Sequence, residues 1–217
     1  MVDALFLGAH PDDYEAFAGG TILRLKKAGK ICAGIIMTDG SAGKNNDVVI
    51  RKLEAESAAK SLELDYFEMV GLKDGYLIDY HDLTKTIANL IRKYKPKILF
   101  THYFEDKHPD HKIIGNITKN ALFLARTKRA DLDGEPYTCK NVLMFIPDIT
   151  YMPESRLFID ITLFLEKKIE ILNIYKSQKG VLESIPLINK YFASEILEDK
   201  EKAVEAFYPY LLTKEHL

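Results

Sequence analysis

The sequence lacks tryptophan, has only two cysteines, and carries no surplus of either charge. Its 217 residues include 30 Lys and Arg against 32 Asp and Glu, which gives a formal net charge of −2 at pH 7. A balanced charge gives no reason to expect nucleic acid or an anionic membrane surface as the main partner. We therefore expect a small molecule as the partner, with no role for nucleic acid or a membrane.

The few cysteines and the absence of long apolar runs bear on the cellular compartment. Cys32 and Cys139 lie far apart and outside any C-x-x-C pattern, so we predict two buried thiols rather than a disulfide. No apolar run reaches membrane-spanning length, and no basic stretch followed by a long apolar segment and a cleavage site opens the chain. These absences predict a cytoplasmic protein.

Strand-like and helix-like segments alternate through the first two thirds of the chain. Apolar runs predict strands at 4–7, 31–37, 64–70, 97–101 and 142–146, with helical patterns between them. This alternation is typical of a Rossmann-like α/β fold, a mostly parallel sheet with helices on both faces. In the common strand order 3-2-1-4-5, strands one and four are neighbours where the ligand crevice opens.

The pattern changes after Pro147. We expect a sixth strand at 156–161, an amphipathic helix at 162–175, and a less periodic tail with a helix near 193–207. No linker composition or internal repeat interrupts the chain, so we predict a single domain over residues 1–217. Its C-terminal part, about 147–217, is expected either to cap the site or to form a subunit contact, which leaves room for a homo-oligomer.

Two turns, after the first and fourth predicted strands, carry unusual chemistry for turns. The first contains His10 and Asp13, and the second contains His108 and His111, with two residues between the members of each pair. Imidazole nitrogens and carboxylate oxygens are ligands for zinc-like metals. Because both turns should lie at the carboxyl ends of neighbouring strands, their convergence favours a divalent-metal site over unrelated histidines.

The remaining histidines are interpreted as ordinary side chains. His81 stands among acidic and aromatic residues before a helix, and His216 is in the tail. His102 ends the fourth predicted strand, near the site, but has no partner at ligand spacing in the sequence.

The two turns also resemble a known family. Ala9 to Asp13, A-H-P-D-D, and His108 to His111, H-P-D-H, resemble the paired motifs of the LmbE-like, or PIG-L-like, N-acetylglucosaminyl deacetylases, a family of zinc hydrolases. The resemblance covers about Met1 to Gln178. The run Tyr103 to Lys107 is most similar to the bacterial branch that contains the bacillithiol-pathway deacetylases. Other segments that look like the family are Gly19-Gly20-Thr21-Ile22, Thr38-Asp39-Gly40, Arg51 with Glu54, Asp74-Gly75, Glu105-Asp106 and Phe158 to Ile161.

The resemblance implies a metal site and a general base. It implies that Zn²⁺ is bound by His10, Asp13 and His111, although Fe²⁺ or Co²⁺ would accept the same ligands. It implies that Asp12 is the general base. Three protein ligands leave zinc a position for water, and the metal makes that water acidic enough to supply hydroxide near neutral pH.

Four further positions carry roles implied by the resemblance. His108 stabilises the oxyanion or protonates the leaving amine, and Asp110 orients His108. Arg51 and Asp74 hold sugar hydroxyls. The implied reaction removes the N-acetyl group from a small molecule that contains N-acetylglucosamine, and it releases acetate and the free amine.

Two departures from the family pattern and three alternatives remain. Tyr14 stands where some members have Glu, and Asp106 stands where some have a tyrosine that assists at the oxyanion. A metallohydrolase of another substrate class, such as a phosphoester or another amide, is one alternative, since basic residues flank the turns at Lys44, Arg51, Lys73 and Lys107. A non-catalytic metal-binding relative is another. A nucleotide-binding protein is disfavoured because no G-x-G-x-x-G follows the first strand.

Overall fold

The computed structural model describes residues 1–42, 47–75, 77, 80–147, 150, 152–198 and 200–213, so Lys44 and His216 lie outside the described residues. Its first 145 residues alternate strands and helices as the apolar pattern predicts. The elements are β1 (Ala4–Gly8), α1 (Asp13–Lys27), β2 (Cys32–Thr38), α2 (Val48–Ser61), β3 (Tyr66–Leu72), α3 (Tyr80–Tyr94), β4 (Ile98–His102), α4 (Pro109–Arg126) and β5 (Asn141–Phe145).

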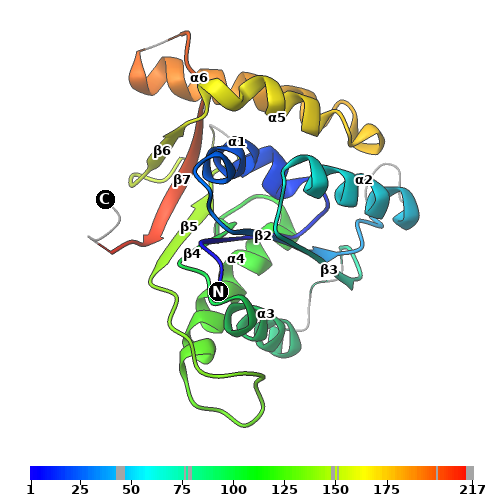
Figure 1. Ribbon diagram of the computed structural model, residues 1–217, viewed down its shortest axis with the longest axis vertical. Helices are drawn as coiled ribbons and strands as arrows, with labels where there is room; N and C mark the ends of the chain where they lie inside the picture. Colours follow the sequence, from blue (N-terminus) through cyan, green and yellow to red (C-terminus); the bar gives the residue numbers. More distant parts are fainter. Residues whose placement is uncertain are drawn as a thin grey trace.

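The sheet has seven strands in the order β3-β2-β1-β4-β5-β7-β6. The first five strands are parallel, which confirms the predicted Rossmann-like layout and the 3-2-1-4-5 order. Helices α3 and α4 cover one face of the sheet, and α1 and α2 cover the other (Figure 1). This arrangement brings the turns after β1 and β4 to the same edge of the sheet.

Successive side chains of β1 point to opposite faces of the sheet and pack in two different core clusters. Leu5 and Leu7 pack in the cluster that contains Ile87 of α3 and Ile117 of α4. Phe6 points to the opposite face, where its ring stacks on Phe100 of β4 with centroids 4.5 Å apart. Because β1 is buried on both faces, its sequence is a continuous apolar run and does not alternate between apolar and polar residues.

The C-terminal part adds two antiparallel strands and an outer layer of helices. The predicted sixth strand is present as β6 (Leu157–Asp160), whereas the helix expected near 193–207 is confirmed only over 193–197 and is wrong over 204–207. The chain instead forms α6 (Ile185–Leu197) and β7 (Val204–Leu211), and β7 lies between β5 and β6. Pairing on both edges fixes this segment as a strand. The other elements of this part are η1 (Thr162–Phe164), α5 (Leu165–Leu172), η2 (Lys176–Gln178) and η3 (Leu182–Ser184).

A buried ion pair attaches this outer layer to the site helix. Lys168 of α5 donates to Glu205 of β7 at 2.7 Å, and both side chains are fully buried. Glu205 also accepts hydrogen bonds from the backbone N–H groups of Gly20 and Thr21 in α1. The C-terminal strand, α5 and α1 therefore meet at one charged cluster.

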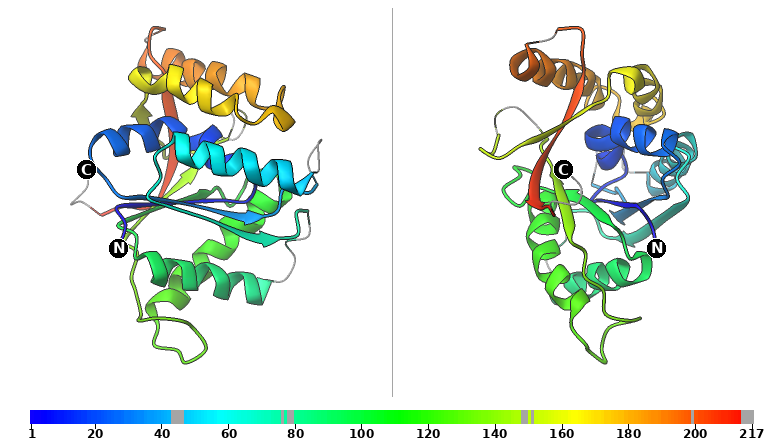
Figure 2. Two further views of the ribbon diagram at one scale, coloured as in Figure 1. Left: turned by 45° about the vertical axis from the view of Figure 1, so that its right-hand side comes forward. Right: turned by 60° about the vertical axis from the view of Figure 1, so that its left-hand side comes forward.

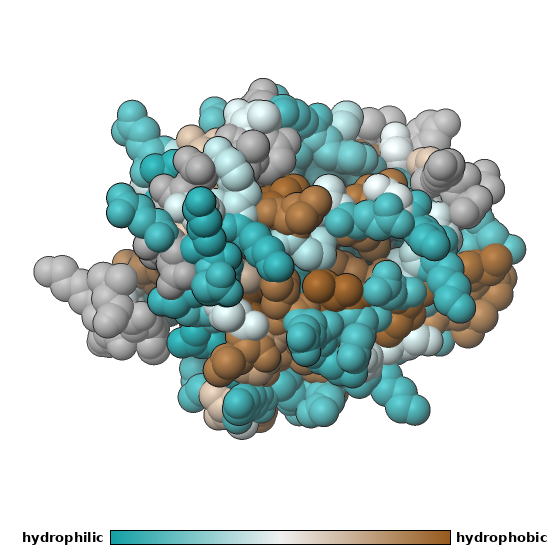
Figure 3. Space-filling model, turned by 90° about the horizontal axis from the view of Figure 1, so that it is seen from above, coloured by the Kyte–Doolittle hydropathy of each residue, from teal (hydrophilic) through white to brown (hydrophobic). Residues whose placement is uncertain are grey.

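The outer layer lies beyond α1 and α2 in two further views of the chain (Figure 2). Seen from above, apolar side chains lie between polar ones on this face (Figure 3). Within the part of the chain that the structure describes, no helix is both long and apolar enough to cross a membrane. Cys32 and Cys139 are buried and unbonded to each other, as predicted.

Candidate active site

The turn after β1 holds His10 and Asp13 side by side. The backbone N–H of His10 donates to Asp13 Oδ2 at 2.7 Å. Between them Asp12 adopts φ 106°, in the left-handed region that favours glycine. A non-glycine residue held in this conformation is strained, and such strain is found most often at functional sites.

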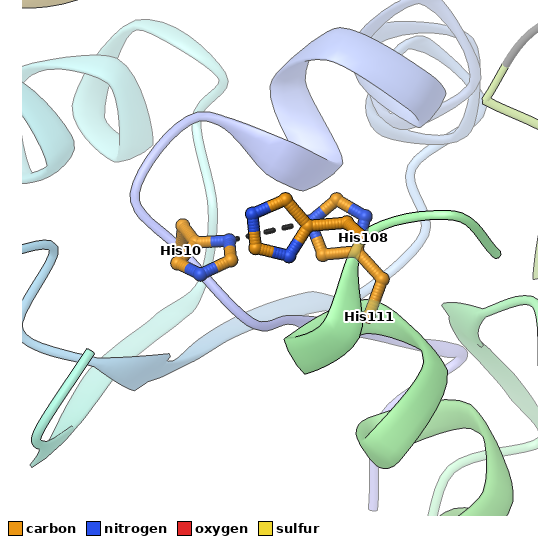
Figure 4. A group of neighbouring side chains, drawn as sticks. All are labelled: His10, His108 and His111. Carbon is orange, nitrogen blue, oxygen red and sulfur yellow. Dashed lines mark hydrogen bonds between the residues drawn. The ribbon is translucent and has the colours of Figure 1, made fainter. Parts of the chain in front are cut away.

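The turn after β4 brings two more histidines to the same place. His108 precedes α4 and His111 lies in the first turn of that helix. Because β1 and β4 pair directly, His10 Nδ1 lies 3.2 Å from His111 Nε2. Figure 4 shows this contact, with His10 on the loop after β1 and both other rings on the α4 side.

His10, Asp13 and His111, the predicted metal ligands, lie close together. His111 Nε2 is 3.1 Å from Asp13 Oδ1, and His10 Nδ1 is 3.4 Å from Asp13 Oδ2. Two ligand atoms each about 2.0–2.1 Å from a tetrahedral ion stand about 3.4 Å apart. The three pairwise distances are near this value, with Oδ1 of Asp13 facing His111 and Oδ2 facing His10, so the predicted ligands lie around one point of the site.

The site also attracts positive charge. Burial lowers the pKa of His10, but Asp13, Asp110 and Asp74 more than compensate and raise it to about 12. Burial likewise lowers the pKa of His111, which Asp13 and Asp106 raise to about 9. Carboxylates this close to one another repel unless a cation lies among them, and a divalent metal meets that need.

Asp12 lies beside the ligands and has a different environment. Burial, followed by the charge of Asp13, raises the pKa of Asp12 to about 7, against the opposing effect of Arg51. Arg51 Nη2 donates to Asp12 Oδ2 at 3.2 Å and to the Pro11 carbonyl at 2.6 Å. A carboxylate with a pKa near neutrality can take up a proton and release it again.

Asp74 and Asp110 both lie against His10. Asp74 Oδ1 is 3.0 Å and Asp110 Oδ2 is 3.2 Å from His10 Nε2. Asp110 also accepts a hydrogen bond from the backbone of Gly75 at 3.0 Å. The resemblance implies that Asp110 orients His108; in the described structure Asp110 contacts His10 and accepts from Gly75. Arg51 pairs with Asp12 and not with Asp74.

His108 is the exposed member of the histidine group. Its ring centroid lies 4.8 Å from that of His10 and 4.4 Å from that of His111. Partial burial, His111 and His10 lower the pKa of His108. It therefore borders the open side of the cavity, where it can reach a bound molecule.

The sequence interpretation missed His102. The side chain is fully buried, its Nε2 lies 3.1 Å from Asp13 Oδ2, and it accepts a hydrogen bond from the Ala9 backbone at 2.9 Å. Its ring stacks on His111 with centroids 3.9 Å apart. The interpretation of His102 as lacking a partner fails because its partner lies on the turn of the neighbouring strand. The one sequence signal that could have placed His102 at the site was its position at the carboxyl end of β4.

Asp106 was also missed. It is buried, with Oδ2 3.1 Å from His111 Nδ1 and Oδ1 accepting from the His108 backbone N–H at 2.9 Å. In the sequence this position stands out through the family-like pair Glu105-Asp106 and through the absence of a tyrosine, but neither assigns it a role at the site.

A cavity of about 480 Å³ opens over these residues. The two turns, α1 and the loop around Asp74 line one part of it. Gln178, Val181, Leu182 and Ile185 of the C-terminal part line another. This segment therefore borders the cavity. The cavity thus combines a floor of acidic and histidine side chains with an apolar wall.

Comparisons with known proteins agree with this geometry. The family model for GlcNAc-PI de-N-acetylase (PIG-L) matches residues 5–122, more than half of the chain. Diacetylchitobiose deacetylase of Thermococcus kodakarensis is 27% identical over 80% of this chain and 69% of its own length. The Bacillus subtilis protein named "Probable N-acetyl-alpha-D-glucosaminyl L-malate deacetylase 2" is 25% identical over 86% of this chain and 92% of its own.

A solved structure extends the similarity to almost the whole fold. The crystal structure of a conserved protein from Thermus thermophilus has a TM-score of 0.89 and 26% identity, and the match covers 98% of this chain and 96% of that one. The family match includes both histidine turns, which the structure brings together around His10 and His111. The chain belongs to the PIG-L family of GlcNAc-PI de-N-acetylases.

Proposed function

We propose that this protein is a zinc-dependent deacetylase that removes the N-acetyl group from a small molecule containing N-acetylglucosamine. The observation that carries the proposal is the convergence of His10, Asp13 and His111, with pairwise distances of 3.1–3.4 Å, at the floor of an open cavity. Membership of the PIG-L family and similarity to named deacetylases support the reaction class.

His10, Asp13 and His111 would hold the metal. A bound divalent ion would supply Lewis-acid activation of water and of the amide carbonyl. The carboxylates of Asp74 and Asp110 hold the His10 ring in place, and His102, which accepts the Ala9 backbone N–H, stacks its ring on His111.

Asp12 and His108 would move the protons. Asp12 takes a proton from the attacking water, for which a pKa near neutrality suits it. His108, on the other turn and facing the cavity, protonates the leaving amine or stabilises the oxyanion. The two residues approach the reacting amide from opposite turns, which keeps the proton acceptor and the donor separate.

Arg51 and Asp74 would contact the sugar. Both line the cavity, although Arg51 also pairs with Asp12 and Asp74 also contacts His10. Sugar hydroxyls both donate and accept hydrogen bonds, so a guanidinium and a carboxylate can bind neighbouring hydroxyls.

The test combines metal analysis with product analysis. We expect about one divalent metal per chain in freshly purified protein and acetate release from at least one of N-acetylglucosamine, diacetylchitobiose and N-acetylglucosaminyl L-malate. Removal of the metal by a chelator should abolish the activity, and Zn²⁺ should restore it. Turnover of chromogenic phosphoesters without acetate release would favour the other class of metallohydrolase and reject the proposal.

A further inference from the structure

Asp106 touches both functional histidines of the second turn. One oxygen, Oδ2, lies 3.1 Å from His111 Nδ1, and the other, Oδ1, accepts the backbone N–H of His108 at 2.9 Å. Its neighbour Glu105 is exposed and hydrogen-bonds only to the Tyr103 hydroxyl in the described structure. The two adjacent carboxylates therefore have different environments, and Asp106 is the one turned toward the site.

An ionised carboxylate can only accept hydrogen bonds, and this determines the state of His111. Asp106 Oδ1 already accepts the His108 backbone N–H, and Oδ2 lies within hydrogen-bond distance of His111 Nδ1. His111 Nδ1 must then carry the proton it donates. When His111 is neutral, as a metal ligand must be, its lone pair is therefore on Nε2, the atom that faces His10 and Asp13.

We infer that Asp106 is a positioning residue that fixes the metal-binding tautomer of His111 and, through the backbone of His108, the location of the proton donor. A carboxylate hydrogen-bonded to a ligand histidine raises the basicity of that ligand and sets its orientation. Asp106 does so while also anchoring the start of α4. The inference rests on the proposed metal site and adds a residue to it.

Two substitutions at this position separate tautomer control from a purely structural role. In Asp106→Asn the side chain keeps its shape but has one acceptor for two donors, the His111 ring N–H and the His108 backbone N–H. If its oxygen faces His108, its amide group faces His111 Nδ1 and stabilises the tautomer protonated on Nε2, which blocks the metal. The same change opposite a catalytic histidine is known to select the wrong tautomer. In Asp106→Ala the ring keeps access to either tautomer.

The experiment measures the Zn²⁺ dissociation constant by competition with a chromogenic chelator. We expect Asp106→Ala to weaken Zn²⁺ binding by about 10–100-fold, and Asp106→Asn to weaken it at least as much. Glu105→Gln, the exposed neighbour, should bind Zn²⁺ as the unmodified protein does. Thermal unfolding of the metal-free variants checks that each is folded. Unchanged Zn²⁺ affinity in Asp106→Asn, or a smaller loss in Asp106→Asn than in Asp106→Ala, would overturn the inference.

A second measurement needs no variant. In the Zn²⁺-loaded unmodified protein, proton NMR with ¹⁵N-labelled histidine should show a His111 Nδ1–H resonance protected from solvent exchange by Asp106. A metal-loaded protein without that protected proton would reject the role of Asp106 and leave the proposed deacetylase intact. Failure of the unmodified protein to bind Zn²⁺ or to release acetate would instead reject the proposed function.

Discussion

Asp12→Asn is expected to separate catalysis from metal binding. The side chain is not one of the three convergent ligands, and its oxygen Oδ2 faces Arg51 at 3.2 Å. Asparagine keeps the size of the side chain and its acceptor for Arg51, but it cannot take a proton from water. Arg51 also retains its 2.6 Å hydrogen bond to the Pro11 carbonyl. We expect the turn to keep its conformation.

The loss of activity in Asp12→Asn should appear as a lower kcat. A positioned general base contributes about 10²–10⁴-fold to the rate, or about 2.7–5.4 kcal/mol of transition-state stabilisation at 1.36 kcal/mol per tenfold. The free energy of unfolding of the variant should not fall along with kcat. Burial of the ionised Asp12 is unfavourable, as its raised pKa indicates, and asparagine tolerates the positive φ of 106° better than most residues.

The assay compares kcat, metal content and unfolding temperature in the same preparation. Exposed Asp131, which pairs with Arg129 away from the site, supplies the control Asp131→Asn. Because a base must be deprotonated to act, the acid limb of the wild-type pH profile should change in Asp12→Asn. Activity of the variant should keep rising at alkaline pH as bulk hydroxide substitutes for the base. Metal content that falls in step with activity would refute the reasoning and make Asp12 a ligand.

Three further predictions concern Asp74, Glu205 and Glu15. Asp74→Ala should lower kcat/KM more for a glucosaminide than for a simple acetamide; an equal loss on both would mean that Asp74 acts through His10, 3.0 Å away. Glu205→Ala leaves the Lys168 ammonium buried without its counter-charge. It should lower the free energy of unfolding by about 3–5 kcal/mol in urea denaturation, and an unchanged midpoint would contradict this. Burial raises the pKa of Glu15 from 4.5 to about 8, so the folded state binds more protons than the unfolded state between these values. Stability of the metal-free protein should therefore fall as pH rises through this range, and Glu15→Gln should flatten that dependence; an identical slope in both proteins would exclude Glu15 as its source.

The sequence by itself determined the alternating α/β pattern and the place of the metal chemistry. The strands β1, β2 and β5 are buried along their whole length, so each appears as an apolar run that needs no knowledge of its neighbours. His10 with Asp13, and His108 with His111, are two pairs that each share one turn. Spacing within a turn is a local property, and the carboxyl ends of parallel strands meet at one edge. These two facts were sufficient to bring the predicted ligands together.

Only the tertiary structure decided the C-terminal part. The first half of β7, 204–207, was expected to be helical, and pairing with β5 and β6 made it a strand. Its Glu205 is a buried charge that Lys168 and the backbone of α1 stabilise, contacts between residues far apart in the sequence. The position of Leu182 and its neighbours at the cavity wall likewise follows from how the tail folds back over α1.

Tertiary structure also decided which residues surround the ligands. His102 reaches Asp13 because β4 pairs with β1, with Phe6 beside Phe100 in the register. The direction of the Asp106 side chain depends on the geometry of the turn before α4 and on burial against His111. Such contacts depend on strand register and side-chain direction, which residue spacing does not encode. The sequence therefore located the two histidine turns, and the fold selected the residues that surround them.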